Sequence, residues 1–374
     1  MKRNYICLLM ALLLSLSAGA QNATTLQQQL KQHFNNKVYP GILIGYSKGM
    51  YNLSQAYGYS NVATKRYLNP SQVMMGGSTG KIVVAAAVLK LVQENKLELD
   101  APISKYLKGE WAEAIPNYTC LTVRQLMQHR TGLARYIFTD FKEDVKQNPD
   151  KVWQPLEQVK YIATIAPKFD CGQDFAYSDT NYLILGAIIE QISGQDFYTY
   201  AEESILKPNH IKMFIPTNTR TIPGLANGYA GENDPLGFTG AALDKEGKSR
   251  YNMQFEWTGG GYAYNPSMMA KLMVAIFEGK VFGTELLKEY TATLPAAEVR
   301  AEYGLGIMKY NLNGKIFYGH SGFFPGYLSQ VYYDPETKEA FAFQINTTET
   351  AGVQDLYKSI NAFFSQRQSP GLAK

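Results

Sequence analysis

Between residues 41 and 59, apolar and polar residues alternate in the manner of β-strands. One run begins with GILIGY at residues 41–46, and a second ends at Tyr59. Lys48 and Gly49 separate the two runs and favour a turn. Because successive side chains of a strand point to opposite faces, this stretch predicts a β-hairpin near the N-terminus.

A second group of strands is predicted near the C-terminus. Asn313-Gly314 is a strong signal for a type I′ turn, so the runs on either side of it should form a hairpin. The last run places Phe341, Phe343 and Ile345 on one face, which we expect to point inward. The expected strands cover residues 303–311, 315–320, 327–333 and 339–346.

Longer apolar runs predict helices. Residues 82–92 are apolar nearly all round, which is typical of a buried helix. Asn265-Pro266 is typical of a helix start, whereas Gly132 and Gly194 are well placed to end helices in the left-handed conformation. The expected helices cover residues 24–35, 82–92, 121–129, 181–192, 266–277 and 353–364.

The strand patterns lie at both ends of the chain and the helical patterns in the middle. Residues 210–255 contain many Gly, Pro and Asn residues, so long loops are expected there. We therefore expect an α/β (α+β) fold, in which an antiparallel sheet built from both chain ends is flanked by helices and carries an inserted, mostly helical region. The sheet region would cover about 21–107 and 256–374, and the helical region about 108–255.

The first twenty residues have the pattern of a secretory signal peptide. Lys2 and Arg3 precede a largely apolar stretch, and Ala18-Gly19-Ala20 is typical of a cleavage site. Cys7 lies inside the apolar stretch and no cysteine directly follows the cleavage site, so a lipid anchor is not indicated. No later apolar run reaches the roughly 20 residues of a spanning helix. The sequence predicts a periplasmic or secreted protein whose mature domain is residues 21–374.

The composition limits the kinds of molecule that the protein is expected to bind. The hydrophobic share of 45% and the charged share of 18% are typical of a globular protein with a large core. The net charge of +4 is small, and no Lys/Arg cluster indicates a nucleic-acid partner. The four histidines have no spacing typical of a metal site, so we expect no metal or cofactor. A monomer acting on a small molecule or peptide is the simplest expectation.

Two cysteines lie beyond the predicted cleavage site. Cys120 and Cys171 would pair in an oxidising compartment and close a loop whose entropic stabilisation is about 4 kcal/mol. Equally, both would fit as small buried apolar residues. The sequence leaves these two alternatives open.

Ser78 and Lys81 form the first pair of residues that indicates chemistry. Gly76 and Gly77 allow a tight turn into Ser78, and Lys81 follows three positions later on the same helix face. A serine at a helix N-terminus gains from the helix dipole. Burial among apolar neighbours would lower the pKa of Lys81 and make it a neutral base for the hydroxyl. The alternative is a helix cap beside an ordinary lysine.

Two later motifs are weaker when taken singly. Tyr177-Ser178-Asp179 precedes the apolar helix over 181–192, where Tyr177 could carry a second proton or the motif could simply cap the helix. His320-Ser321-Gly322 ends a predicted strand. There Gly322 would let a substrate backbone approach, and neighbouring N–H groups could bind an oxyanion. The alternative is a hairpin turn with an exposed histidine.

In this order, the motifs STGK (Ser78–Lys81), YSD (Tyr177–Asp179) and HSG (His320–Gly322) resemble those of the serine β-lactamase and penicillin-binding-protein superfamily. The resemblance is to the class C branch, which includes D-alanyl-D-alanine carboxypeptidases, D-aminopeptidases, esterases and acyltransferases. Supporting stretches such as LTVRQLMQHRTGL and GHSGFFPGY spread it over residues 38–346. It implies a β-lactamase/transpeptidase-like fold.

The resemblance also implies roles for individual residues. Ser78 would be the nucleophile, Lys81 its activating partner, and Tyr177 a residue that shares proton transfer and helps protonate the leaving group. His320 would take the place of a strand lysine or histidine that attracts a substrate carboxylate. The backbone N–H groups of Ser78 and Phe323 would form the oxyanion hole.

Asp179 departs from the usual family pattern, in which an asparagine follows the tyrosine by two positions. Asparagine can donate a hydrogen bond to a substrate carbonyl, whereas an ionised aspartate can only accept one. The change weakens the case for β-lactams and favours a substrate with an amine or hydroxyl at this point. Asp179, Ser321 and Gly322 are expected to contact the substrate.

The leading interpretation is an exported serine hydrolase that forms an acyl-enzyme on Ser78. Its expected substrates are D-alanyl peptides or related small amides and esters, as in D-Ala-D-Ala carboxypeptidases. The alternatives are an esterase or acyltransferase that passes the acyl group to an alcohol, a β-lactamase, and a catalytically silent cell-wall-binding protein.

Overall fold

The computed structural model describes residues 28, 39–349 and 358. The predicted signal peptide (1–20) lies outside these residues, as do the helices predicted over 24–35 and 353–364 except for one residue of each. Among the described helices, none combines the length and apolar character needed to cross a membrane.

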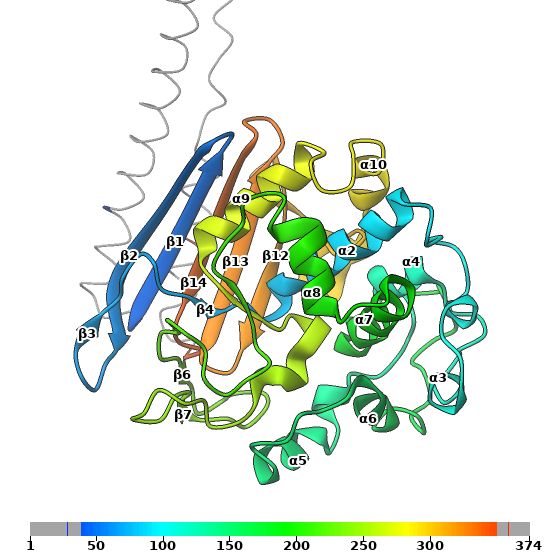
Figure 1. Cartoon of the computed structure of the whole chain (residues 1–374), viewed down its shortest axis with the longest axis horizontal. Helices are drawn as coiled ribbons and strands as arrows, with labels where there is room; N and C mark the ends of the chain where they lie inside the picture. Colours follow the sequence, from blue (N-terminus) through cyan, green and yellow to red (C-terminus); the bar gives the residue numbers. More distant parts are fainter. Residues whose placement is uncertain (1–27, 29–38, 350–357, 359–374) are drawn as a thin grey trace, which may run out of the picture.

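The centre of the fold is a large antiparallel sheet (Figure 1), whose strands come from both ends of the described chain. The N-terminal strands join the C-terminal ones where β1 pairs with β14, for instance Ile42 with Ile345. The expected fold class is confirmed. In spatial order the strands are β3 (Arg66–Tyr67), β2 (Tyr51–Asn61), β1 (Gly41–Lys48), β14 (Glu339–Ile345), β13 (Tyr327–Asp334), β12 (Lys315–Phe324), β11 (Met308–Leu312), β10 (Ala301–Tyr303) and β9 (Leu294–Ala296).

Both predicted hairpins are present. Strands β1 and β2 turn after Lys48, as expected. Asn313 (φ 54°) and Gly314 (φ 86°) both have positive φ, as a type I′ turn requires. The prediction of a single strand over 303–311 was wrong. The Gly304 N–H donates to Ile307 O and closes a turn, which separates β10 from β11.

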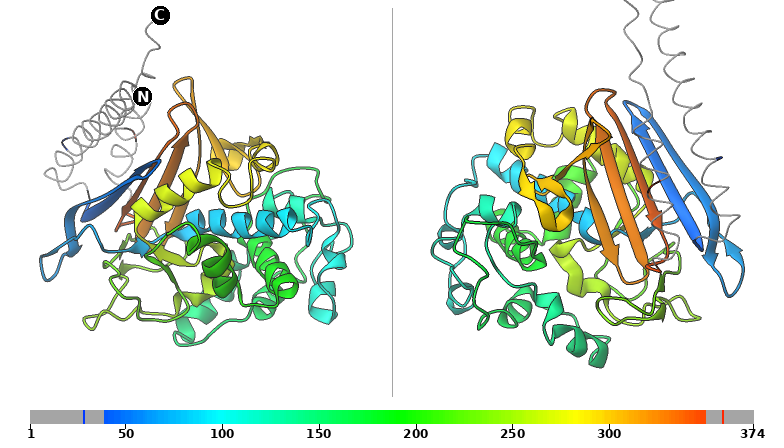
Figure 2. Two further views of the ribbon diagram at one scale, coloured as in Figure 1. Left: turned by 45° about the horizontal axis from the view of Figure 1, so that its top comes forward. Right: turned by 180° about the vertical axis from the view of Figure 1, so that it is seen from behind.

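The two faces of the sheet are packed differently. Helix α9 (Pro266–Phe277) crosses one face (Figure 2), where Gly45 of β1 leaves room for the helix start. Its neighbour across the sheet is the small residue Ala342. Phe341 and Phe343 are buried as predicted but belong to a separate apolar cluster on the opposite face. The sequence analysis expected these side chains to point into the main core. Small residues lie on that face of the sheet instead, because α9 approaches it closely.

A helical layer covers the α9 face and extends beyond the sheet. Helix α2 (Lys81–Gln93) is almost completely buried, as predicted, and packs against helix α7 (Asp179–Ser193), which Gly194 ends at φ 70°. The other helical segments are η1 (Gly77–Gly80), η2 (Ile103–Lys105), α3 (Glu110–Glu113), α4 (Val123–Met127), η3 (Tyr136–Phe138), α5 (Phe141–Gln147), α6 (Pro155–Lys160), α8 (Phe197–Ala201), η4 (Glu202–Leu206), η5 (Met253–Gly259), α10 (Leu287–Tyr290) and η6 (Ala297–Val299).

Helix α4 is shorter than the helix predicted over 121–129. A capping box between Thr122 and Gln125 starts it, and it ends at Met127. His129 (φ 55°), and not Gly132, is the first left-handed residue after the helix. A Cβ atom on Gly132 would lie only 2.5 Å from Phe169 O. Gly132 is therefore required for a close approach between two loops and does not cap the helix.

The remaining short strands form two small sheets apart from the large one. Asn265 caps α9 by accepting from Ser267 N, as the sequence predicted. The loops expected over 210–255 are present, with only brief pairing. The small strands are β4 (Met74–Met75), β8 (Tyr262–Tyr264) and β5 (Phe214–Pro216) in one sheet, and β6 (Tyr229–Ala230) and β7 (Gly240–Ala241) in another.

Cys120 and Cys171 form a disulfide, with their Cα atoms 6.2 Å apart. The bridge closes a loop of 51 residues that contains α4, α5 and α6. Of the two alternatives that the sequence left open, the paired one is therefore present. The bridge ties together a part of the chain that has short helices and long connections.

Candidate active site

Ser78 lies in the tight helical turn η1, directly before α2 and beside the end of β12. Gly77 (φ 52°) turns the chain, and a Cβ atom on it would lie only 2.9 Å from Phe323 N. On the strand side, a Cβ atom on Gly322 would collide with Gly76 O. The small size of Gly322 thus admits the backbone before Ser78, whereas the sequence had suggested that it admits a substrate.

Lys81 lies one turn beyond Ser78 and is completely buried. Its Nζ atom donates to Ser78 Oγ (3.1 Å), to Asp179 Oδ1 (2.7 Å) and to Gly259 O. Three acceptors match the three N–H groups of an ammonium ion. Burial lowers the pKa of Lys81, but Asp179 and Tyr177 together outweigh it and hold the pKa above the ordinary value of 10.5. The expectation of a neutral Lys81 base is therefore corrected.

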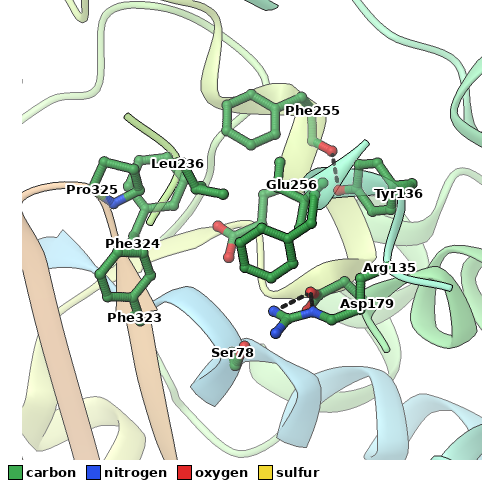
Figure 3. A pocket seen from close by; sticks show the side chains of 12 residues that line it. Ser78, Arg135, Tyr136, Asp179, Leu236, Phe255, Glu256, Phe323, Phe324 and Pro325 are labelled. Atoms are coloured by element: carbon green, nitrogen blue, oxygen red, sulfur yellow. Dashed lines mark hydrogen bonds and ion pairs between the residues drawn. The ribbon is translucent and has the colours of Figure 1, made fainter. Parts of the chain in front are cut away.

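Asp179 occupies the start of α7 and is paired on both carboxylate oxygens. Oδ1 accepts from Lys81, and Oδ2 accepts from Arg135 through Nη2 (2.7 Å) and Nε (3.0 Å) (Figure 3). Burial would raise the pKa of Asp179, but the two cations hold it well below its usual range. Ser178, and not Asp179, is the N-cap residue of α7. Asp179 is therefore a buried counter-ion and has little capacity left for a substrate amine.

Tyr177 lies beside Lys81 and Asp179. The Lys81 Nζ atom lies 5.1 Å from the centroid of its ring. Its hydroxyl is buried and has no hydrogen-bond partner among the described residues. Burial raises the pKa of Tyr177, while the neighbouring Lys81 ammonium and the Ser78 hydroxyl lower it. The hydroxyl is therefore neutral and free to exchange a proton with a neighbouring group.

The end of β12 has a free edge toward Ser78. In the described chain β11 pairs only with Lys315–Gly319, while β13 pairs with Tyr318–Phe324 on the other side. The backbone of Phe323 therefore remains available along the pocket, next to the turn that holds Ser78. Two adjacent backbone N–H groups can stabilise an oxyanion, and the role that the family resemblance implied for Ser78 and Phe323 stays a prediction. The sequence analysis expected Ser321 to contact the substrate, and in the structure its Oγ lies 3.9 Å from Met308 Sδ.

His320 is buried and differs from the cation that the sequence suggested. Its Nδ1 lies 2.6 Å from Ser321 O and therefore donates, so Nε2 accepts from the Tyr303 hydroxyl at 2.8 Å. Burial lowers the pKa of His320 to about 3. The ring is neutral near pH 7, which removes the basis for attracting a substrate carboxylate.

The same network continues to a second buried histidine. His129 Nδ1 accepts from the backbone N–H of Ser178 (3.2 Å), so His129 Nε2 donates to the Tyr303 hydroxyl (3.2 Å). Burial also lowers the pKa of His129. A chain of neutral groups therefore connects the start of α7 with β12 beneath Tyr177. The scattered positions of His129 and Tyr303 gave no sign of this link in the sequence.

Ser78, Asp179 and Phe323 line one pocket together with residues from several other segments. Figure 3 shows Ser78 at its base, with Arg135 and Asp179 on one side and Glu256 directed into it. The lining is otherwise largely apolar. It consists of Ser78, Arg135, Tyr136, Ile137, Phe138, Asp179, Leu236, Phe255, Glu256, Phe323, Phe324 and Pro325.

Arg135 and Glu256 are two ionisable residues of the pocket that sequence reasoning missed. Arg135 follows the LTVRQLMQHRTGL stretch, and Glu256 precedes the Gly259–Gly261 run. Neither has a spacing to Ser78 that indicates proximity, because long loops bring both to the site. The glycine run was the one available signal, since it marked a place where two backbones could approach closely.

Comparison with known proteins finds one matching family and several similar proteins. A match to the Beta-lactamase family covers residues 26–361. A teichoic acid D-alanine hydrolase from Staphylococcus aureus is 23% identical over 89% of this chain and 77% of its own length. The D-amino acid amidase from Ochrobactrum anthropi SV3, crystallised with L-phenylalanine amide, superposes with a TM-score of 0.78 at 20% identity over 92% of this chain and 97% of its own. A penicillin-binding protein from Bacillus halodurans superposes with a TM-score of 0.73 at 22% identity, over 91% and 100% of the two chains.

Proposed function

The chain belongs to the Beta-lactamase family of serine hydrolases, and on this premise we propose that it is an exported enzyme that forms an acyl-enzyme on Ser78. We propose small D-alanyl amides and esters as its substrates. The observation that carries the proposal is the contact of Ser78 Oγ with the Lys81 ammonium beside an unpartnered Tyr177 hydroxyl.

In the acylation step, Ser78 Oγ attacks the substrate carbonyl and forms a new C–O bond. Lys81 remains an ammonium ion because the Asp179 carboxylate stabilises its positive charge. The ammonium in turn stabilises the negative charge that develops on Ser78 Oγ. The neutral Tyr177 hydroxyl relays the proton: it gives its own proton to the leaving amine or alkoxide, whose bond to the carbonyl carbon breaks, and takes the Ser78 proton in exchange. Water reverses this sequence and releases the acid.

The charge that develops on the carbonyl oxygen would be held by the backbone N–H groups of Ser78 and Phe323. Both groups belong to segments packed tightly through Gly77 and Gly322, so they are placed before the substrate arrives. Preorganised donors of this kind typically contribute 10²- to 10³-fold to the rate.

The proposed substrate class is supported by the relatives and by the site. Two relatives are described as a D-alanine hydrolase and a D-amino acid amidase. The ionised Asp179 can only accept hydrogen bonds, which disfavours β-lactams. Export is supported by the signal-peptide pattern of residues 1–20 and by the disulfide between Cys120 and Cys171, since disulfides persist in oxidising compartments.

Replacement of the nucleophile tests the reaction. In Ser78→Ala we expect covalent labelling by fluorophosphonate and penicillin probes to disappear, and turnover of D-alanine p-nitroanilide to fall at least about 1,000-fold. Ser71→Ala, at an exposed serine outside the pocket, is the matched control and should keep both. Turnover by Ser78→Ala above a few per cent of wild type would require another nucleophile. Product that forms only with added alcohol would instead indicate an acyltransferase.

A further inference from the structure

Glu256 is an ionisable residue of the pocket that the proposed mechanism does not use. Its side chain reaches into the pocket that Ser78 lines (Figure 3). Its Oε2 atom is shielded from solvent and has no hydrogen-bond partner among the described residues. Buried polar atoms are nearly always paired in proteins, so an unpaired carboxyl oxygen beside a nucleophile suggests a missing ligand.

The backbone holds Glu256 in this direction. Trp257, the next residue, has φ 37° and ψ −121°, a conformation rarely adopted by a bulky residue. Its indole is buried, and a Cβ atom on Gly186 of α7 would lie only 2.7 Å from the ring. Because the indole is anchored on α7, the preceding side chain is directed away from the core and into the pocket. Backbone strain of this kind is often found at functional sites.

The surroundings of Glu256 match a small cation. The other pocket carboxylate, Asp179, already accepts from Lys81 and from Arg135. Lys81 in turn donates to Ser78, Asp179 and Gly259 O, so its three N–H groups are all used. Within the part of the chain that the structure describes, Glu256 forms no ion pair, although it lies beside this network and Lys81 lowers its pKa from a distance. A Cβ atom on Gly259 would lie 3.6 Å from Glu256 Cγ and 3.9 Å from Asp179 Cβ.

We propose that Glu256 binds the free α-ammonium group of the acyl part of the substrate. This inference rests on the proposed function, because a D-alanyl amide or ester carries that ammonium next to the carbonyl that Ser78 attacks. It also moves the amine-binding role from Asp179, where the sequence suggested it, to a carboxyl group on a different segment. The burial that raises the pKa of Glu256 to about 8 would be offset when the ammonium provides its charge.

Substrate discrimination tests the site. For wild type and Glu256→Gln, kcat/KM is measured for D-alanine p-nitroanilide and for N-acetyl-D-alanine p-nitroanilide, which lacks the ammonium. We expect the ratio of the two values to fall by roughly 10- to 100-fold in Glu256→Gln, the usual effect of losing a hydrogen bond between charged groups. Glu190→Gln removes a carboxyl group on α7 that bonds Phe197 N outside the pocket, and it should leave the ratio unchanged. An equal loss for both anilides would overturn the proposal.

Binding without turnover separates this inference from the proposed function. D-alaninamide and propionamide, which differ in the ammonium group, are titrated by NMR into Ser78→Ala and into Ser78→Ala/Glu256→Gln. We expect D-alaninamide to bind the single variant more tightly than propionamide does, and the double variant to lose that preference. This result would support the ammonium site even if the wild type hydrolysed neither anilide. Equal binding of the two amides to Ser78→Ala would overturn it.

Discussion

Two walls of one pocket carry a carboxyl group each, and the two groups have opposite surroundings. On the α7 wall, Asp179 accepts hydrogen bonds from Lys81 and Arg135, and its pKa lies well below the usual range. On the η5 wall, Glu256 has an unpartnered oxygen, and burial raises its pKa to about 8. Both are desolvated, so burial alone does not decide the charge of a carboxyl group in this pocket.

The two walls differ in whether their polar groups are already satisfied by other residues of the chain. The α7 wall is a completed ionic network that fixes Lys81 against Ser78, and its groups are satisfied before any substrate enters. The η5 wall leaves a polar group unsatisfied, as expected for a surface that is completed by a ligand. Our two proposals therefore assign catalytic positioning and substrate recognition to different segments of the chain.

Replacing each carboxyl group by its amide should give the largest difference in stability between the two walls. Asp179→Asn removes the negative charge from two cations, and we expect the free energy of unfolding to fall by about 3–5 kcal/mol, because it leaves the buried Lys81 ammonium uncompensated. Urea unfolding at pH 7 measures the loss.

Glu256→Gln is the matched control for this change. It replaces a carboxyl group that has an unpartnered oxygen, and we expect it to cost little or to stabilise the protein. A loss for Asp179→Asn no larger than that for Glu256→Gln would show that the α7 wall does not depend on its ion pairs.

A smaller effect should come from the network beneath the α7 wall. Tyr303→Phe removes the hydroxyl between His129 and His320 and leaves two buried ring nitrogens without that partner. We expect a loss of about 2 kcal/mol in thermal or urea unfolding, since an unsatisfied buried group costs about 1–3 kcal/mol. Tyr290→Phe is the matched control, because the Tyr290 hydroxyl is buried but has no partner in the described chain. Equal losses for the two variants would mean that the network adds no stability.

The smallest effect, measured per pH unit, should appear in the pH dependence of stability. The pKa of Glu256 is about 8 in the folded protein against an ordinary value of 4.5, so between these values the unfolded chain has released a proton that the folded chain keeps. Stability should therefore fall as pH rises through this window. The slope should be no more than about 1.4 kcal/mol per pH unit, the limit for one group.

Urea unfolding at pH 5, 6, 7 and 8 would show this slope as the difference between wild type and Glu256→Gln, in which the contributions of other groups cancel. Asp179 should act in the opposite sense, because its lowered pKa stabilises the folded state above the ordinary value of 3.8 and that stabilisation is lost as pH falls. Parallel stability curves for wild type and Glu256→Gln would contradict the raised pKa of Glu256.

Much of the fold followed from local patterns. The alternation in residues 41–59, the turn at Asn313-Gly314 and the cap at Asn265 are local signals, and each produced the predicted element. One error arose from contacts between distant segments, and the other from a local turn that the sequence analysis missed. Helix α9 displaced the large side chains of β14 to the opposite face, and the turn at Gly304 divided one predicted strand.

The sequence by itself determined the fold class, the helix that follows Ser78 and the pairing of Ser78 with Lys81. These depend on residues a few positions apart, where chain geometry sets the distance. Only the tertiary structure decided the charge of Lys81, the neutrality of His320, and the presence of Arg135 and Glu256 in the pocket. Charge states depend on desolvation and on partners within about 3 Å, and here those partners lie between 17 and 98 residues away along the chain.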